Sequence, residues 1–167
     1  MNITQLYLSG NVRRWHSNPI MADTGQNLAD HHGRCIQLLL HLHPSASPAL
    51  IRAMAFHDVG ELAAGDLSFD FKQAQPQKAA AHAEFETAAR EVICGADPVL
   101  TDEEQAWLSM IDRLEAAAYV LVARPWESVR KASGWAMYFA NVRRTAGDLG
   151  VGWQVDILLN DLDAGAW

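Results

Sequence analysis

The chain has 167 residues, of which 50% are hydrophobic and 20% are charged, a composition that fits a globular domain of ordinary size and excludes a disordered chain. It carries 13 basic and 20 acidic residues without any block of Lys or Arg, so duplex nucleic acid is not expected as a partner. The first residues lack the pattern of a signal peptide and no apolar run is long enough for a membrane span, so we expect a cytoplasmic protein, in the host cytoplasm if it is viral, with no membrane partner.

Helical periodicity extends through most of the sequence, and the alternation of a half-buried strand is absent. A short helical segment opens the chain, and a loop containing Asn18-Pro19 follows it. Further helices are expected, in chain order, over residues 24–43, 47–62, 77–93, 101–123, 126–145 and 151–162, with a loop over 68–77. The predicted fold is therefore all-α, a single domain over residues 1–167 that forms a compact bundle of about six or seven helices.

The early loop places a cation beside a large aromatic side chain, in Arg14 and Trp15. One interpretation is a surface loop whose Trp15 covers the core. The other is a ligand clamp, in which Arg14 binds a phosphate and Trp15 stacks on a base. The sequence leaves both interpretations open.

The helix expected over 24–43 carries His31 on the same face as its leucines. A single histidine on such a face is more often a core residue than a ligand, and the adjacent His32 makes the assignment less clear. The two cysteines, Cys35 and Cys94, lie in apolar helical stretches without the spacing of a thiolate metal site. No disulfide framework is expected, and the compartment is expected to be reducing.

The helix expected over 47–62 ends in an unusual group of polar residues. Ser47 and Pro48 favour its start, and His57, Asp58 and Glu61 then fall near its last turn. If this face is buried, a bound cation would satisfy the imidazole and the carboxylates together, whereas a solvated helix end is the alternative.

The helix after the Thr101-Asp102-Glu103-Glu104 capping box carries Asp112 close to its apolar face. Three predicted helices thus direct potential metal ligands inward, namely His31, then His57 with Asp58, then Asp112. Two imidazoles and two carboxylates leave open positions on a six-coordinate ion for a water and a substrate oxygen. Mixed nitrogen and oxygen donors suit Mn, Fe, Co, Ni or Zn better than Mg alone.

A series of motifs accompanies these four residues. They are Arg14-Trp15, Asn27-Leu28-Ala29-Asp30-His31, His57-Asp58-Val59-Gly60-Glu61, Gly65-Asp66-Leu67 followed by Lys72, and Asp112-Arg113-Leu114-Glu115-Ala116. In this order they resemble the HD-domain phosphohydrolases, in particular bacterial 5′-deoxynucleotidases and short phage-type dATP triphosphohydrolases. The resemblance covers about residues 12–122. The sequence departs from it at Ser68 and Asp70, where relatives often carry prolines, and at Ser109, where they can carry lysine.

The resemblance implies an HD-domain fold and a role for each matching residue. His31, His57, Asp58 and Asp112 would bind a divalent transition metal (Co, Mn, Zn, Ni or Fe), with additional Mg²⁺ if the substrate is a triphosphate. Glu61 and Asp66 would be the catalytic residues that assist proton transfer. Arg14, Trp15 and Lys72 would bind the nucleotide.

The expected function is hydrolysis of the P–O5′ ester of a deoxynucleotide, by a dATP-type triphosphohydrolase that releases deoxynucleoside and triphosphate. A 5′-deoxynucleotidase that releases phosphate from dNMPs is the alternative, and a non-catalytic nucleotide-binding HD protein is a further one. Glu61 and Asp66 argue against the last, because binding alone needs neither. The expected partner is a small deoxynucleotide, and the protein is expected to be a homo-oligomer.

Overall fold

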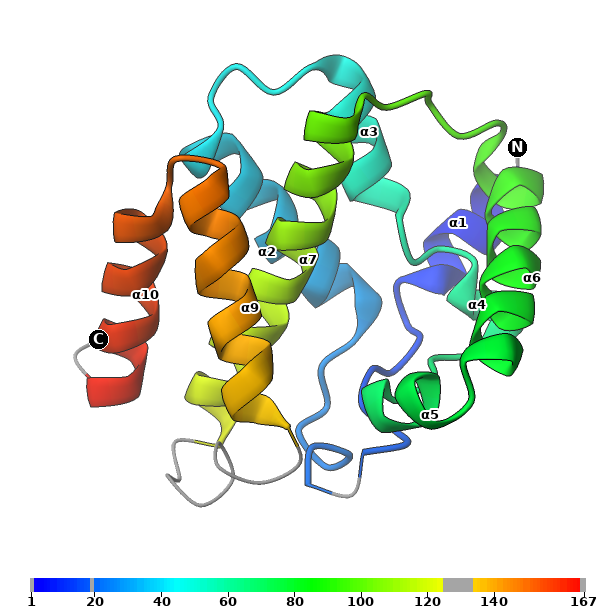
Figure 1. Ribbon diagram of the computed structural model, residues 1–167. Helices are drawn as coiled ribbons and strands as arrows, with labels where there is room; N and C mark the ends of the chain where they lie inside the picture. Colours follow the sequence, from blue (N-terminus) through cyan, green and yellow to red (C-terminus); the bar gives the residue numbers. More distant parts are fainter. Residues whose placement is uncertain (1, 19, 125–133, 166–167) are drawn as a thin grey trace. The chain divides into compact units, whose positions relative to one another are not determined.

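The computed structural model describes residues 2–18, 20–124 and 134–165, and these residues contain helices and no strand (Figure 1). An isolated bridge joins Arg13 and Asn27. The helices are α1 (Ile3–Ser9), α2 (Leu28–Leu42), α3 (Pro48–Phe56), α4 (Glu61–Ala64), α5 (Phe69–Ala74), α6 (Pro76–Cys94), α7 (Asp102–Ala123), α9 (Trp135–Asp148) and α10 (Gly152–Ala164). The prediction of an all-α fold is confirmed.

The helix expected over 47–62 is interrupted, which is the main difference from the prediction. Ser47 caps its start as expected, since its Oγ accepts a hydrogen bond from the Leu50 N–H at 3.1 Å. However, α3 ends at Phe56, a turn follows, and α4 begins at Glu61. In a continuous helix the Met54 and His57 carbonyls would accept backbone N–H groups, but here they accept side-chain donors. His57 Nδ1 donates to the Met54 carbonyl at 2.8 Å, and Arg90 Nη1 donates to the His57 carbonyl at 2.7 Å.

Other boundaries differ less. The helix expected from residue 24 begins at Leu28, because Asn27 caps it by accepting the Asp30 N–H at 2.9 Å. The loop expected over 68–77 contains the short helix α5, which is capped by Ser68. The helix expected over 126–145 begins at residues that lie outside the described ranges, and its described part is α9. The added short helices raise the number of described helices above the six or seven expected.

The described helices fall into two compact units, each built from two stretches of the chain. The first contains residues 1–33 and 52–99, and the second contains residues 34–51 and 100–167. That residues 1–167 form a single domain stays a prediction.

The first unit has a small core beneath α6. Val59, Ile93 and Cys94 are buried there, and Leu6, Phe56 and Leu62 pack against them. In this unit α4 and α5 lie against α6 (Figure 1). A Cβ added at Gly60 would lie 2.1 Å from the Glu86 carbonyl oxygen, so only glycine permits this close approach of the turn before α4 to α6.

The second unit is built on α7, α9 and α10, which run beside one another (Figure 1). Its buried side chains include Leu39, Trp107, Leu114, Val142, Ala146, Val155 and Leu159. The capping box predicted at Thr101 is present, with the Thr101 side chain bonded to the Glu104 N–H and the Glu104 side chain bonded to the Thr101 N–H. Within the described ranges, no helix combines the length and the apolar character needed to cross a membrane.

Candidate metal centre

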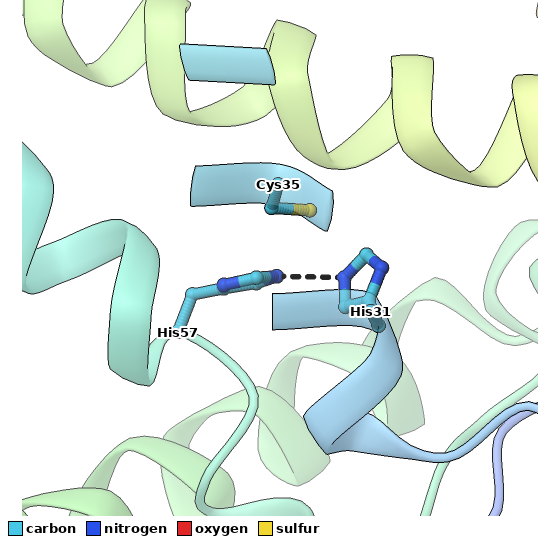
Figure 2. Close-up of side chains that lie close together, drawn as sticks. All are labelled: His31, Cys35 and His57. Carbon is cyan, nitrogen blue, oxygen red and sulfur yellow. Dashed lines mark hydrogen bonds between the residues drawn. The ribbon is translucent and has the colours of Figure 1, made fainter. Parts of the chain in front are cut away.

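His31, His57 and Asp58 come together in the first unit. Nε2 of His31 and Nε2 of His57 lie 3.0 Å apart, as drawn by the dashed line in Figure 2. Oδ2 of Asp58 lies 3.5 Å from the first nitrogen and 3.3 Å from the second. Three potential ligand atoms, one from His31 and two from the distant pair His57-Asp58, therefore converge on one point.

This cluster is removed from solvent. The His31 side chain is fully buried, and those of His57 and Asp58 are only 10% and 17% exposed. Cys35, also labelled in Figure 2, follows His31 by one turn along α2 and is buried as well. Burial would raise the pKa of Asp58, but the charge of His57 and hydrogen bonds from His31 and His57 outweigh it and hold that pKa well below its usual range. Asp58 is thus ionised at neutral pH, as a ligand of a cation must be.

Neighbouring groups determine whether Nδ1 of each histidine ring donates or accepts a hydrogen bond. His57 Nδ1 lies 2.8 Å from the Met54 carbonyl oxygen, which can only accept, so His57 carries a proton on Nδ1. His31 Nδ1 contacts Nη1 of Arg14, which can only donate. His31 Nδ1 therefore accepts, so the proton of a neutral His31 ring lies on Nε2, which faces Nε2 of His57 and the Asp58 carboxylate. The same contacts thus give a continuous hydrogen-bonded chain from Arg14 to Met54.

His32 also lies beside these rings, with its centroid 5.7 Å from that of His31 and 4.8 Å from that of His57. Burial, followed by the charge of His57, lowers the pKa of His32 to about 3, so it is neutral. It belongs to none of the ligand groups that could hold an ion.

Glu61 lies next to the cluster at the start of α4 and is 7% exposed. Burial, followed by the charges of Asp58 and Asp66, raises its pKa to about 9, so that Glu61 holds a proton at neutral pH. Its Oε2 has no hydrogen-bond partner among the described residues. An orphaned buried carboxyl oxygen is costly for folding alone, which is typical of functional positions.

Hydrogen bonds connect the Arg14-Trp15 loop to residues of the same site. Asp66 accepts a hydrogen bond from the Trp15 N–H at 3.2 Å, and the Trp15 indole N–H donates to Oε1 of the buried Gln26 at 2.6 Å. Trp15 has φ 65°, which is uncommon for a bulky residue, and Arg14 lies over its ring at 5.4 Å. Trp15 is half-buried and therefore still presents part of its surface to solvent.

Two predicted site residues remain, Lys72 and Asp112. Lys72 is exposed on α5, and its charge acts on Glu86 of α6. Asp112 is half-buried on α7, in the second unit. Its role as a fourth metal ligand stays a prediction.

Glu86 and Arg90 on α6 are part of this region but were missed from the sequence. Carboxylate oxygens of Glu86, Glu61 and Asp58 lie within 4.8 Å of one another. Arg90 binds the His57 carbonyl and pairs with Asp97 through two nitrogens. The charges of this helix lie on several of its faces, so the sequence did not indicate that either residue belongs to the site. Their partners come from distant parts of the chain.

The residues present fit a transition-metal ion. Imidazole nitrogens and one carboxylate are the donor set of many Zn, Fe, Co and Mn sites. His57 already has the proton placement of a ligand that binds through Nε2, with a backbone carbonyl orienting its ring.

Comparison of the chain with protein-family models, with curated proteins and with solved structures finds no match.

Proposed function

We propose that the protein is a metal-dependent phosphohydrolase of the HD-domain type that cleaves the ester between O5′ and the first phosphorus of a deoxynucleotide. The preferred substrate is a deoxynucleoside triphosphate of the dATP type, released as deoxynucleoside and triphosphate. The convergence of His31, His57 and Asp58 on one buried point is the observation that supports this proposal most. The order of the sequence motifs supports the choice of reaction.

His31, His57 and Asp58, with Asp112 as the predicted fourth ligand, would hold the ion. A bound divalent ion at such a site polarises a phosphate oxygen and lowers the pKa of a water molecule. The remaining steps depend on side chains of this chain.

Proton transfer is assigned to Glu61 and Asp66. Glu61 holds a proton at neutral pH, which suits a general acid that protonates the leaving O5′. Asp66 is positioned through its bond to the Trp15 N–H and can accept a proton from an attacking water.

Substrate binding is assigned to Arg14, Trp15 and Lys72. The Arg14 guanidinium is already directed at the His31 ring, so a phosphate held beside the metal ligands lies within its reach. The partly exposed Trp15 ring offers a stacking surface for the base or sugar. Lys72, exposed on α5, adds positive charge that a triphosphate can use.

A non-catalytic role for the cluster is the second candidate. It is favoured by the continuous hydrogen-bonded chain from Arg14 through both histidines to the Met54 carbonyl, which satisfies these groups without an ion. The orphaned carboxyl oxygen of Glu61 counts against it, because a purely structural cluster has no use for that group.

The test is a panel of dNMPs and dNTPs incubated with the metal-free protein and with Co²⁺, Mn²⁺, Zn²⁺ or Mg²⁺ added. The proposal predicts metal-dependent release of triphosphate from dATP, and a His57→Ala variant serves as the inactive control. Release of phosphate from dNMPs alone would move the assignment to a 5′-deoxynucleotidase. The absence of any turnover with every metal, in a protein that binds nucleotide, would favour the non-catalytic role.

A further inference from the structure

Three acidic side chains meet on the α6 side of the cluster. Asp58 comes from the turn after α3, Glu61 begins α4 and Glu86 lies near the middle of α6. Each offers a carboxylate oxygen within 4.8 Å of the others. Three carboxyl groups this close repel one another when ionised, and a cation between them would remove that repulsion.

The local packing fixes this geometry. The turn before α4 approaches α6 so closely that Gly60 meets the Glu86 backbone, with an added Cβ placed 2.1 Å from its carbonyl oxygen. This contact places Glu61, the next residue, opposite the Glu86 side chain. The carboxylates are therefore held together by the backbone and do not merely lie on a shared surface.

Glu61 gives an independent indication of a ligand. Its side chain is more than nine-tenths buried, with a residue exposure of 7%. Its Oε2 has no hydrogen-bond partner among the described residues. A buried carboxyl group that has an unpaired oxygen and lies beside two further carboxyl groups is a ligand position for a cation.

His82 lies beside Glu86 on α6. Its Nε2 bonds the Ala64 carbonyl at 3.1 Å, and its Nδ1 lies 3.9 Å from Oε2 of Glu86. His82 belongs to no group with these three residues, so among the described residues the group of Asp58, Glu61 and Glu86 contains oxygen donors alone. Oxygen donors without nitrogen or sulfur suit hard cations such as Mg²⁺, Mn²⁺ or Ca²⁺.

We propose that Asp58, Glu61 and Glu86 form a second cation site, specific for a hard divalent ion, that shares Asp58 with the histidine site. The role of this ion would be to offset the charge of a polyphosphate bound next to it. Only this role, and not the existence of the site, rests on the proposed function. With the ion bound, Glu61 is an ionised ligand and no longer the general acid, so Asp66 passes the proton that it takes from the attacking water to the leaving O5′.

The experiment counts Mn²⁺ ions bound per chain, from the electron paramagnetic resonance signal of free Mn²⁺ during a titration of metal-free protein. The wild type is expected to bind two ions. Glu86→Gln should retain one and weaken the other by more than about tenfold, because it removes an anionic ligand without changing size. Glu84→Gln, on the exposed side of the same helix, should bind two ions like the wild type.

His57→Ala separates the two sites, since it should lose the histidine site and keep the one that depends on Glu86. Equal Mn²⁺ binding by Glu86→Gln and Glu84→Gln, both with wild-type melting temperatures, would overturn the second site. The proposed function would not be affected by that result. It fails instead if His57→Ala binds Mn²⁺ as the wild type does.

Discussion

Arg90 donates a hydrogen bond from Nη1 to the backbone carbonyl oxygen of His57 at 2.7 Å. The same guanidinium pairs with Asp97 through Nε at 3.0 Å and through Nη2. A residue on α6 thus anchors the turn that carries both His57 and Asp58. Arg90 is a positioning residue for the candidate metal centre.

Arg90→Lys is expected to loosen this turn, because a single ammonium group cannot bind Asp97 and the His57 carbonyl in the same way. Transition-metal affinity should fall by about 10–100-fold, as for other groups that orient a ligand. Isothermal titration with Co²⁺ measures this. Arg144→Lys, at an exposed pair with Asp148, is the control and should leave affinity unchanged. Unchanged affinity in Arg90→Lys would remove its positioning role.

Gly60 and Gly33 are expected to respond in opposite ways to alanine. A Cβ at Gly60 would collide with the Glu86 backbone, and overpacking of this kind costs about 1–3 kcal/mol or more of the free energy of unfolding. At Gly33, inside α2, a Cβ meets nothing within 4 Å, so alanine should stabilise the protein by about 0.5–1 kcal/mol. Urea denaturation of both variants checks this pair. A Gly60→Ala variant as stable as the wild type would contradict the close approach of this turn to α6.

Arg14 and a metal ion require opposite tautomers of His31, so we expect their binding to His31 to be mutually exclusive. Arg14 donates to His31 Nδ1, whereas a neutral His31 that binds an ion through Nε2 must carry its proton on Nδ1. Arg14 must therefore turn away when the ion binds, and a substrate phosphate would hold it there.

Arg14→Ala should consequently bind Co²⁺ more tightly than the wild type without nucleotide, yet turn over nucleotide more slowly. Calorimetric titration gives the affinity, and initial rates give the turnover. Arg13→Ala, with an exposed side chain, is the matched control. Weaker Co²⁺ binding in Arg14→Ala would show that Arg14 supports the metal site instead of competing with it.

The raised pKa of Glu61 gives a pH dependence of stability in the metal-free protein. Between pH 4.5, the ordinary pKa of a glutamate, and pH about 9, Glu61 is protonated in the folded protein and ionised in the unfolded chain. The folded state then binds more protons, so the free energy of unfolding decreases as the pH rises through this range. Glu61→Gln should make that decrease smaller, which urea denaturation in EDTA at several pH values measures. Parallel pH profiles for both proteins would contradict the raised pKa.

The sequence predicted the parts of the structure that depend on local signals. The Thr101 capping box and the helix behind it appear as expected, because the interactions involved lie within four residues of one another. The proximity of His31 to His57 and Asp58 was also predicted, from helices expected to direct all three inward, although His57 and Asp58 lie in the turn after α3.

What the sequence did not predict depends on tertiary contacts. The charge pattern of the helix expected over 77–93 predicts a solvated face for its acidic residues and for His82. This holds for the exposed Glu84 and Glu91 but is wrong for Glu86 and His82, which are half-buried. Their burial follows from the packing of α4 on α6. The only indication of this packing in the sequence is Gly60, and the residue that Gly60 contacts, Glu86, lies 26 positions later in the chain. The break after Phe56 was missed for a similar reason, since Arg90 supplies part of what ends that helix.

The central claim is that His31, His57 and Asp58 hold an ion on which phosphoester hydrolysis depends. The most direct measurement determines bound Co²⁺ per chain and dATP turnover on the same samples of wild type, Asp58→Ala and the exposed control Asp161→Ala. The claim predicts that Asp58→Ala loses both the bound Co²⁺ and the release of triphosphate while the control keeps both, because Asp58 is the anionic ligand between the two histidines. A folded Asp58→Ala protein with the Co²⁺ content and turnover of the wild type would contradict it.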